Sequence, residues 1–368
     1  MFNAVILKNN TARKSFSVYL LGTLISSLCV SLSLAYEIDS DANIHDSKAS
    51  LLGINHIGLS VQDLDATLDF YLTATNFKLV KREVVANNND ADRLFGRKGV
   101  AYERAVLEAP NMLFELTEFS HNRETPMRVM PVYGPGMTHT CFQSPAHLSG
   151  YDKFKQAGAR MLSRGDEPVD LLGQGVTYAY AYDPEGNMLE LEQLDFSVLG
   201  GDPRKPEWVD AGLDMWMTQV ALVTHDIERL TTYYSKIFGF NPYRAADISN
   251  RLPFDDATDI DDVSLKVVFF RMAQRTKSME FWQYVNPETP QIQGDRDSTA
   301  LGYSYSIEVE DIQAEYARMT DLGVKFVSEP VLIGDFWQVY ANDIDGNVFA
   351  LRQAVDPNSP WSVPNLEL

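Results

Sequence analysis

Cysteine and basic residues are both scarce in this chain. Its 368 residues include 2 cysteines, Cys29 and Cys141, and Cys29 lies in an apolar N-terminal segment that we expect to be removed. Because Cys141 then stands alone, no intramolecular disulfide can form and the fold depends on its hydrophobic core. Lys and Arg total 31 against 51 Asp and Glu, which gives a formal net charge of −20. Such an acidic surface repels phosphate groups and disfavours nucleic acids and anionic lipids as partners.

Sequence signatures of nucleotide binding are missing as well. The chain contains neither a phosphate-binding loop nor a dinucleotide fingerprint. Hydrophobic residues make up 45% and charged residues 22%, which is typical of a soluble globular protein and excludes a collagen-like or wholly disordered chain.

The N-terminus has the features of a secretory signal peptide. Residues 1–35 carry three basic residues and no acidic one, and an apolar run begins at Phe16. The run ends in Ser33-Leu34-Ala35, which places small residues where a signal peptidase inspects the chain. Several Ser and Thr residues weaken the run as a membrane-spanning helix. We therefore expect residues 1–35 to be a cleaved signal peptide, residues 36–52 to be a flexible leader, and the mature protein to be periplasmic or secreted, without membrane contact.

The rest of the chain repeats one pattern four times. Asn55-His56-Ile57-Gly58 matches Thr218-Gln219-Val220-Ala221, and each stretch is followed by a helix with paired aromatics, Phe70-Tyr71 and Tyr233-Tyr234, at a constant spacing of 163 residues. Asp183-Pro184-Glu185-Gly186-Asn187 matches Asp343-Ile344-Asp345-Gly346-Asn347 in a strand-turn-strand pattern. Each unit predicts a strand, a helix and about three further strands. We name the units module 1 (53–120), module 2 (136–196), module 3 (214–286) and module 4 (302–354).

Four stretches of the sequence resemble the vicinal oxygen chelate superfamily, which includes glyoxalase I, methylmalonyl-CoA epimerase, extradiol dioxygenases and antibiotic-binding resistance proteins. They are Asn55-His56-Ile57-Gly58-Leu59-Ser60-Val61, Phe114-Glu115-Leu116-Thr117, Gly136-Met137-Thr138-His139 and Asp183-Pro184-Glu185-Gly186-Asn187-Met188-Leu189-Glu190-Leu191. The resemblance implies an α+β fold in which four βαβββ modules pair into two cup-shaped, glyoxalase-like domains.

The predicted domain order follows from pairing consecutive modules. We expect a first domain over residues 53–197, a linker over residues 198–213, a second domain over residues 214–355 and a C-terminal tail over residues 356–368. A homodimer is compatible with the resemblance.

The resemblance also implies a metal site, because four side chains in each cup of the superfamily point toward one cation. In the first domain the matching residues are His56, Glu115, His139 and Glu190. Imidazole and carboxylate groups suit one divalent ion such as Zn, Ni, Fe or Mn. The matching residues of the second domain are Gln219, Glu280, Tyr305 and Ala350. Alanine cannot coordinate a metal, so we expect the second site to be degenerate.

Three functions remain open at this stage. The first is a glyoxalase-like lyase or isomerase, in which the metal stabilises an enediolate of a small oxygenated substrate and Glu190 or Glu115 acts as general base. The second is an extradiol-type dioxygenase that holds Fe(II) with His56, His139 and Glu190. The third is a small-molecule binding protein of the same fold without turnover.

We predict that the mature chain begins near Tyr36, because Ser33-Leu34-Ala35 fits the cleavage pattern of signal peptidase. Mass spectrometry of protein recovered from the periplasm or the medium should find this N-terminus. Intact Met1 on protein from a membrane fraction would show an uncleaved anchor instead.

Overall fold

The computed structural model describes residues 35–36, 46–126, 128–170, 173–272 and 277–366. Apart from Ala35, the predicted signal peptide lies outside the described residues. Among the described residues, no helix is both long and apolar enough to cross a membrane.

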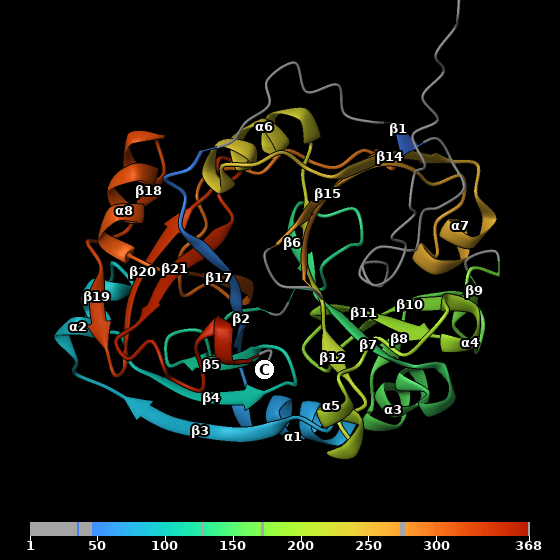
Figure 1. Cartoon of the computed structure of the whole chain (residues 1–368), viewed down its shortest axis with the longest axis horizontal. Coiled ribbons are helices and arrows are strands. Elements are labelled where there is room, and N and C mark those ends of the chain that lie inside the picture. Colours follow the sequence, from blue (N-terminus) through green and yellow to red (C-terminus); the bar gives the residue numbers. More distant parts are fainter. Residues whose placement is uncertain (1–34, 37–45, 127, 171–172, 273–276, 367–368) are drawn as a thin grey trace, which may run out of the picture.

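The predicted modules are present, each with a strand, a helix and further strands (Figure 1). Module 1 contains β2 (Leu51–Val61), α1 (Leu64–Ala74), β3 (Lys78–Val85), α2 (Asn89–Leu94), β4 (Tyr102–Glu108) and β5 (Leu113–Phe119). Module 2 contains β6 (Gly136–His139), β7 (Cys141–Pro145), α3 (Gly150–Ala157), β8 (Arg160–Met161), β9 (Val169–Asp170), β10 (Val176–Tyr182) and β11 (Met188–Leu194). Short helices α4 (Phe196–Leu199) and α5 (Pro206–Asp210) follow in the predicted linker.

The second half of the chain repeats this order. Module 3 contains β12 (Trp216–Met217), β13 (Gln219–Val223), α6 (Ile227–Phe238), β14 (Arg244–Ser249), α7 (Leu252–Thr258), β15 (Ser264–Arg271) and β16 (Ser278–Asn286). Module 4 contains β17 (Gly302–Val309), α8 (Ile312–Asp321), β18 (Lys325–Phe326), β19 (Val331–Ile333), β20 (Phe336–Asn342) and β21 (Val348–Ala354). The tail ends in α9 (Val363–Leu366), and β1 (Ala35–Tyr36) pairs with β14.

Side-chain caps define where the helices begin. Asp63, Asp226 and Asp311 follow the first strands of modules 1, 3 and 4, and each side chain accepts a hydrogen bond from a backbone N–H in the first turn of α1, α6 or α8. A short acidic side chain in this position satisfies N–H groups that the helix itself leaves unpaired. Gly239 ends α6 with a positive φ of 75°, which glycine adopts without steric cost.

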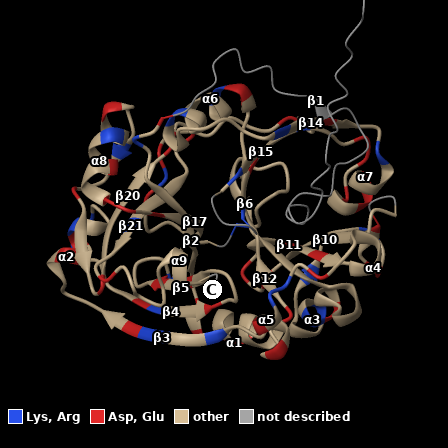
Figure 2. Cartoon of the chain, in the orientation of Figure 1, with Lys and Arg blue, Asp and Glu red and all other residues tan. Residues whose placement is uncertain are grey.

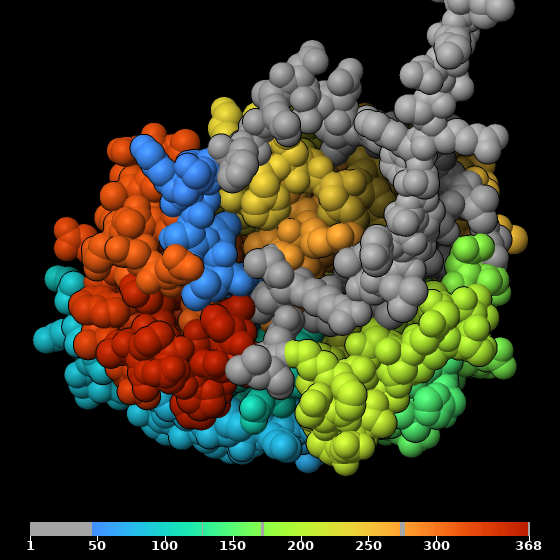
Figure 3. Space-filling model, in the orientation of Figure 1, coloured from blue at the N-terminus to red at the C-terminus, as the bar shows by residue number. Residues whose placement is uncertain are grey.

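The two halves of the chain are joined through the first strands of their modules, whereas the other strands pair mainly within their own module. β2 of module 1 runs antiparallel to β17 of module 4, with His56 opposite Ser306, in a nine-stranded sheet that contains only strands of these two modules. β6 of module 2 runs antiparallel to β13 of module 3, with His139 opposite Ala221. We name the concave surface of modules 1 and 4 cup A, and that of modules 2 and 3 cup B. Early (blue) and late (orange to red) segments accordingly lie side by side in Figure 3.

The helices of consecutive modules make the complementary contacts. The rings of Phe70 on α1 and Phe154 on α3 lie 5.8 Å apart, which joins module 1 to module 2. Arg318 on α8 donates a hydrogen bond of 2.6 Å to the carbonyl oxygen of Ile237 on α6, which joins module 4 to module 3. One continuous core of buried side chains lies on the helix side of the sheets. Figure 2 shows charged residues gathered on the outer helices and on edge strand β3.

The predicted α+β fold of four modules in two cups is confirmed. The predicted pairing of modules 1 with 2 and 3 with 4 is wrong, because each first strand forms its hydrogen bonds with a module from the other half. Residues 53–197 and 214–355 therefore do not each form a cup.

This pairing predicts that cutting the linker will not separate the halves. Gly200, Gly201 and Asp202 are exposed, so a protease site inserted there should be cleaved in the folded protein. The two halves should still migrate together in gel filtration, because two antiparallel strand pairs and a shared core connect them. Two separate species in native buffer would contradict the pairing, and separation only in denaturant would support it.

Candidate metal centre

The structure divides the four predicted ligands between the two cups. His56 and Glu115 lie in cup A, where His56 Nε2 is 3.6 Å from Glu115 Oε2. His139 and Glu190 lie in cup B, where His139 Nε2 is 2.9 Å from Glu190 Oε2. The prediction that all four converge is wrong, because modules 1 and 2 contribute to different sheets.

Cup B unites His139 and Glu190 with two residues that we had assigned to a degenerate site. Gln219 begins β13 and its Nε2 donates to Glu190 Oε1 at 3.2 Å. Glu280 lies on β16, which pairs with β13 in parallel. All four side chains belong to residues that are 2–5% exposed. Each first strand and each last strand of the cup thus supplies one candidate ligand: His139, Glu190, Gln219 and Glu280.

A break between β6 and β7 turns His139 into the cup. Met137 packs in the helix-side core, and the register of β6 against β13 shifts between Ala221 and Leu222. Such an irregularity re-aims the following side chain. Thr140 fixes the break, since its hydroxyl donates to the carbonyl oxygen of Gln219 at 2.7 Å and its own carbonyl accepts from the backbone N–H of Glu190 at 3.0 Å.

The site carries more buried negative charge than these four residues show. Ligand atoms of Cys141, Glu190 and Glu192 all lie within 4.8 Å of one another, and all three residues are buried. Burial, together with the charges of Glu190 and Glu192, holds the pKa of Glu280 well above its usual range. The same causes raise the pKa of the Cys141 thiol, which favours the protonated form. A bound cation at this point would relieve the repulsion among the carboxylates.

The donor set fits a divalent cation. His139 Nδ1 lies 2.9 Å from Thr138 Oγ1. Its buried Nε2 faces Glu190 Oε2 at 2.9 Å, but among the described residues it forms no hydrogen bond of acceptable geometry. A neutral imidazole that donates through Nδ1 presents the Nε2 lone pair to the cup. One imidazole nitrogen and two carboxylates suit Zn, Ni, Fe or Mn. The amide oxygen of Gln219 accepts a hydrogen bond from Thr218 Oγ1 at 2.7 Å, so it joins this donor set only when the amide group turns over. Glu192 is held to one side by Gln143, which donates to it and accepts from Trp216.

In cup A, arginine side chains balance the charge of the buried carboxylate. Glu115 accepts hydrogen bonds from Arg352 Nη1 at 2.8 Å and from Arg104 Nη1 at 3.1 Å. Burial opposes ionisation of Glu115, but the attraction of His56, Arg104 and Arg352 holds its pKa below the usual range. Burial also lowers the pKa of His56 to about 3, with Arg352 and Arg104 acting in the same direction and Glu115 opposing. Two guanidinium groups occupy this cup, so a metal cation would be repelled.

The remaining predicted positions of cup A do not face a metal either. Tyr305 points to the helix side, where its hydroxyl bonds with that of Tyr234. Ala350 packs among buried apolar residues. Arg352, two residues further along β21, lies on the same face of its strand as Ala350. The repeat of Asp183–Asn187 at Asp343–Asn347 aligns Arg352 with Glu192 in the sequence. The change from a carboxylate to a guanidinium at this position could have indicated a cup without metal.

The comparisons with known proteins cover most of the chain. Residues 53–191 match a family model described as the Glyoxalase/Bleomycin resistance protein/Dioxygenase superfamily, and residues 218–340 match a second model with the same description. Ethylmalonyl-CoA/methylmalonyl-CoA epimerase of Cereibacter sphaeroides is 27% identical over 143 residues, which are 38% of this chain and 97% of that protein.

Two solved structures superpose on most of the chain. Glyoxalase I from Zea mays superposes with a TM-score of 0.55 at 21% identity, covering 82% of this chain and 92% of that chain. A putative dioxygenase from Bacillus subtilis gives a TM-score of 0.53 at 12% identity, covering 83% and 86%. At these identities the likeness establishes the fold alone. With two matching segments that together span more than half of its length, the chain belongs to the Glyoxalase/Bleomycin resistance protein/Dioxygenase superfamily, the vicinal oxygen chelate superfamily.

Proposed function

We propose that cup B is the active site of a metal-dependent enzyme that moves a proton on a small oxygenated substrate, as a lyase or isomerase does. The observation that carries the proposal is the buried set of His139, Glu190, Gln219 and Glu280, in which His139 Nε2 faces a carboxylate without a hydrogen bond and the carboxylates are crowded. When bound by these residues, a divalent cation supplies Lewis-acid stabilisation for negative charge that develops on neighbouring substrate oxygens.

Two carboxylates in one cup suit the transfer of a proton from one carbon or oxygen of a substrate to another. Gln219 holds Glu190 by a hydrogen bond, and Ser278 Oγ donates to Glu280 Oε1 at 3.0 Å. Each carboxylate is thus oriented by a neutral partner at one oxygen, and the other oxygen of Glu190, Oε2, faces His139 Nε2 at 2.9 Å. Carboxylates held in this way can take or return a proton. We assign general-base and general-acid roles to Glu190 and Glu280, in place of the Glu190 and Glu115 of the sequence analysis.

Aromatic side chains surround these carboxylates. The ring of Tyr180 lies edge-on to His139, with centroids 5.2 Å apart. Tyr284 and Trp282 are buried in the same cup. Such walls exclude water and strengthen the electrostatic interactions of a developing anion with its surroundings.

The comparisons support isomerase chemistry through the names of the relatives. An epimerase inverts a carbon centre, which requires removal and return of a proton, and one relative is named as an epimerase of two coenzyme A esters. Glyoxalase I shares the fold of all four modules. Neither name identifies the substrate of this chain.

The two alternatives are less well supported. An Fe(II) site made of His56, His139 and Glu190 needs residues from both cups, since His56 lies beside Glu115 in cup A while His139 lies beside Glu190 in cup B. Cup B offers a single histidine among its candidate ligands. A binding protein without turnover does not need two oriented carboxylates at its centre, and measurement of proton exchange distinguishes it from an enzyme.

Metal binding should depend on cup B and not on cup A. We expect His139→Ala and Gln219→Ala to lower the affinity for Zn or Ni by more than about tenfold, because each removes a ligand atom. His56→Ala is the matched control and should keep the affinity of the parent. Bound metal, determined by mass spectrometry after dialysis, and the thermal shift on metal addition are the measurements. If His56→Ala loses metal while Gln219→Ala retains it, the site has been placed in the wrong cup.

Proton exchange should depend on the two carboxylates even where metal remains bound. Incubation in D2O with a panel of α-hydroxy carbonyl compounds and 2-substituted acyl thioesters should label one of them next to its carbonyl group. Glu280→Gln and Glu190→Gln should slow the labelling by roughly 10²–10⁴-fold, the usual contribution of general acid-base catalysis. Labelling that proceeds equally fast with the variants would refute the assigned roles. Tight binding of a panel member without any labelling would favour the binding protein.

A further inference from the structure

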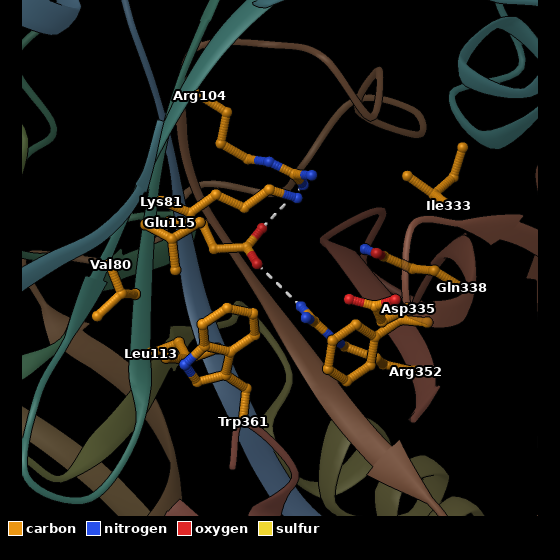
Figure 4. A pocket seen from close by; sticks show the side chains of 12 residues that line it. Val80, Lys81, Arg104, Leu113, Glu115, Ile333, Asp335, Gln338, Arg352 and Trp361 are labelled. Atoms are coloured by element: carbon orange, nitrogen blue, oxygen red, sulfur yellow. Dashed lines mark hydrogen bonds and ion pairs between the residues drawn. The ribbon is translucent and has the colours of Figure 1, made fainter. Parts of the chain in front are cut away.

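Cup A contains a small cavity next to its two arginines. It has a volume of about 40 Å³ and is lined by β3, β4, β5, β20, β21 and the C-terminal segment. Figure 4 shows Glu115 between Arg104 and Arg352, with Gln338 and Trp361 facing the same space. This volume holds a few waters or one small anion.

Two buried donors that line this cavity have no acceptor among the described residues. Arg352 uses Nη1 for Glu115, but its Nε forms no hydrogen bond. Gln338 Nε2 also forms none. Arg352 is 6% exposed and Gln338 is 3% exposed, so bulk water does not compensate them. The two residues are direct cross-strand partners on β20 and β21, which places both donors on one side of the cavity. Buried donors without partners are rare in folded proteins and indicate a missing acceptor.

Three cationic and three anionic side chains surround the cavity, so it tolerates an acceptor with one negative charge better than one with two. Two guanidinium groups share Glu115, and Arg104 also pairs with Glu83. His56 is neutral, because burial lowers its pKa to about 3. Arg352 is held in place by Phe336, whose ring centroid lies 3.6 Å from the guanidinium carbon. At the exposed rim Lys81 pairs with Glu83 at 2.9 Å, and Asp335 adds a negative charge that opposes a dianion.

Apolar side chains complete the opposite wall. Val80, Val106 and Leu113 line the cavity from module 1, and Trp361 closes it from the C-terminal tail. The tail is fixed there, because Asn55 Nδ2 donates to the carbonyl oxygen of Trp361 at 2.9 Å. A ligand therefore meets donors on one side and a short apolar surface on the other.

We propose that cup A is a binding site for a small monocarboxylate. Its two oxygens accept hydrogen bonds from Arg352 Nε and Gln338 Nε2, and its short alkyl group lies against Leu113 and Trp361. Arg352 presents a charge-assisted donor, which is the geometry that carboxylates favour. This site lies in a different sheet from the metal centre and does not depend on the proposed function.

The test uses the full chain after removal of metal with EDTA, so that a carboxylate cannot bind through a cation in cup B. Acetate and propionate are titrated by calorimetry, with thermal unfolding as a second measurement. Sodium chloride of equal ionic strength and sodium phosphate serve as reference salts. We expect saturable binding of at least one carboxylate, and a rise in the unfolding temperature that chloride does not produce.

Two variants place the ligand in the cavity. Gln338→Leu removes one donor at similar volume, and Arg352→Lys keeps the charge but removes Nε. Each should weaken carboxylate binding by roughly tenfold, as expected for a lost hydrogen bond to a charged group. Gln219→Leu, which alters a buried glutamine of cup B, is the matched control and should leave carboxylate affinity unchanged.

Several results would overturn the proposal. They are the absence of saturable binding by either carboxylate, equal affinity in Gln338→Leu and the parent, and loss of binding in Gln219→Leu alone. Phosphate binding more tightly than both carboxylates would also overturn it, because the site would then recognise a tetrahedral oxyanion.

Discussion

The antiparallel pairing of first strands across the two halves of the chain is the constraint on which the site depends. β2 pairs with β17 and β6 pairs with β13, so each cup takes one module from each half. The helices pack within the halves, as the contact of Phe70 with Phe154 shows. Each module thus contacts one module through its first strand and another through its helix. Because all four modules are linked in this way, the two cups cannot form independently. The candidate metal centre lies on one of these shared surfaces, between residues from modules 2 and 3.

The two cups differ in what compensates the negative charge of their buried carboxylates. An ionised carboxylate removed from water is stable only beside a positive charge. In cup A that charge is covalently part of the protein, since Arg104 and Arg352 both bond to Glu115. In cup B, burial and the charges of Glu190 and Glu192 raise the pKa of Glu280, and His139 Nε2 faces Glu190 without forming a hydrogen bond. A bound cation would satisfy cup B, whereas it would be repelled from cup A. One fold repeated twice thus provides a candidate site for a metal in cup B and the site that we propose for an anion in cup A.

Much of the fold and part of the candidate site could be predicted from the repeated residues. The modules, their Asp helix caps and the strand positions of His56, Glu115, His139 and Glu190 follow from local patterns, which the structure reproduces. Gln219 and Glu280 were also recognised as matching positions, but a wrong pairing assigned them to a degenerate site. The aromatic walls of cup B and the tail that places Trp361 over cup A were not predictable, because they depend on contacts between residues far apart in the sequence.

The sequence by itself determined the four modules and most of the side chains that face the cups, although Tyr305 points to the helix side instead. It did so because strand alternation and helix capping are local, and depend on residues a few positions apart. Only the tertiary structure decided which modules share a cup. All four modules offer the same first strand with the same unpaired backbone groups, so the hydrogen-bonding pattern allows several pairings. The choice of module 3 as the partner of module 2 placed Gln219 and Glu280 opposite His139 and Glu190, and left His56 and Glu115 beside Arg352.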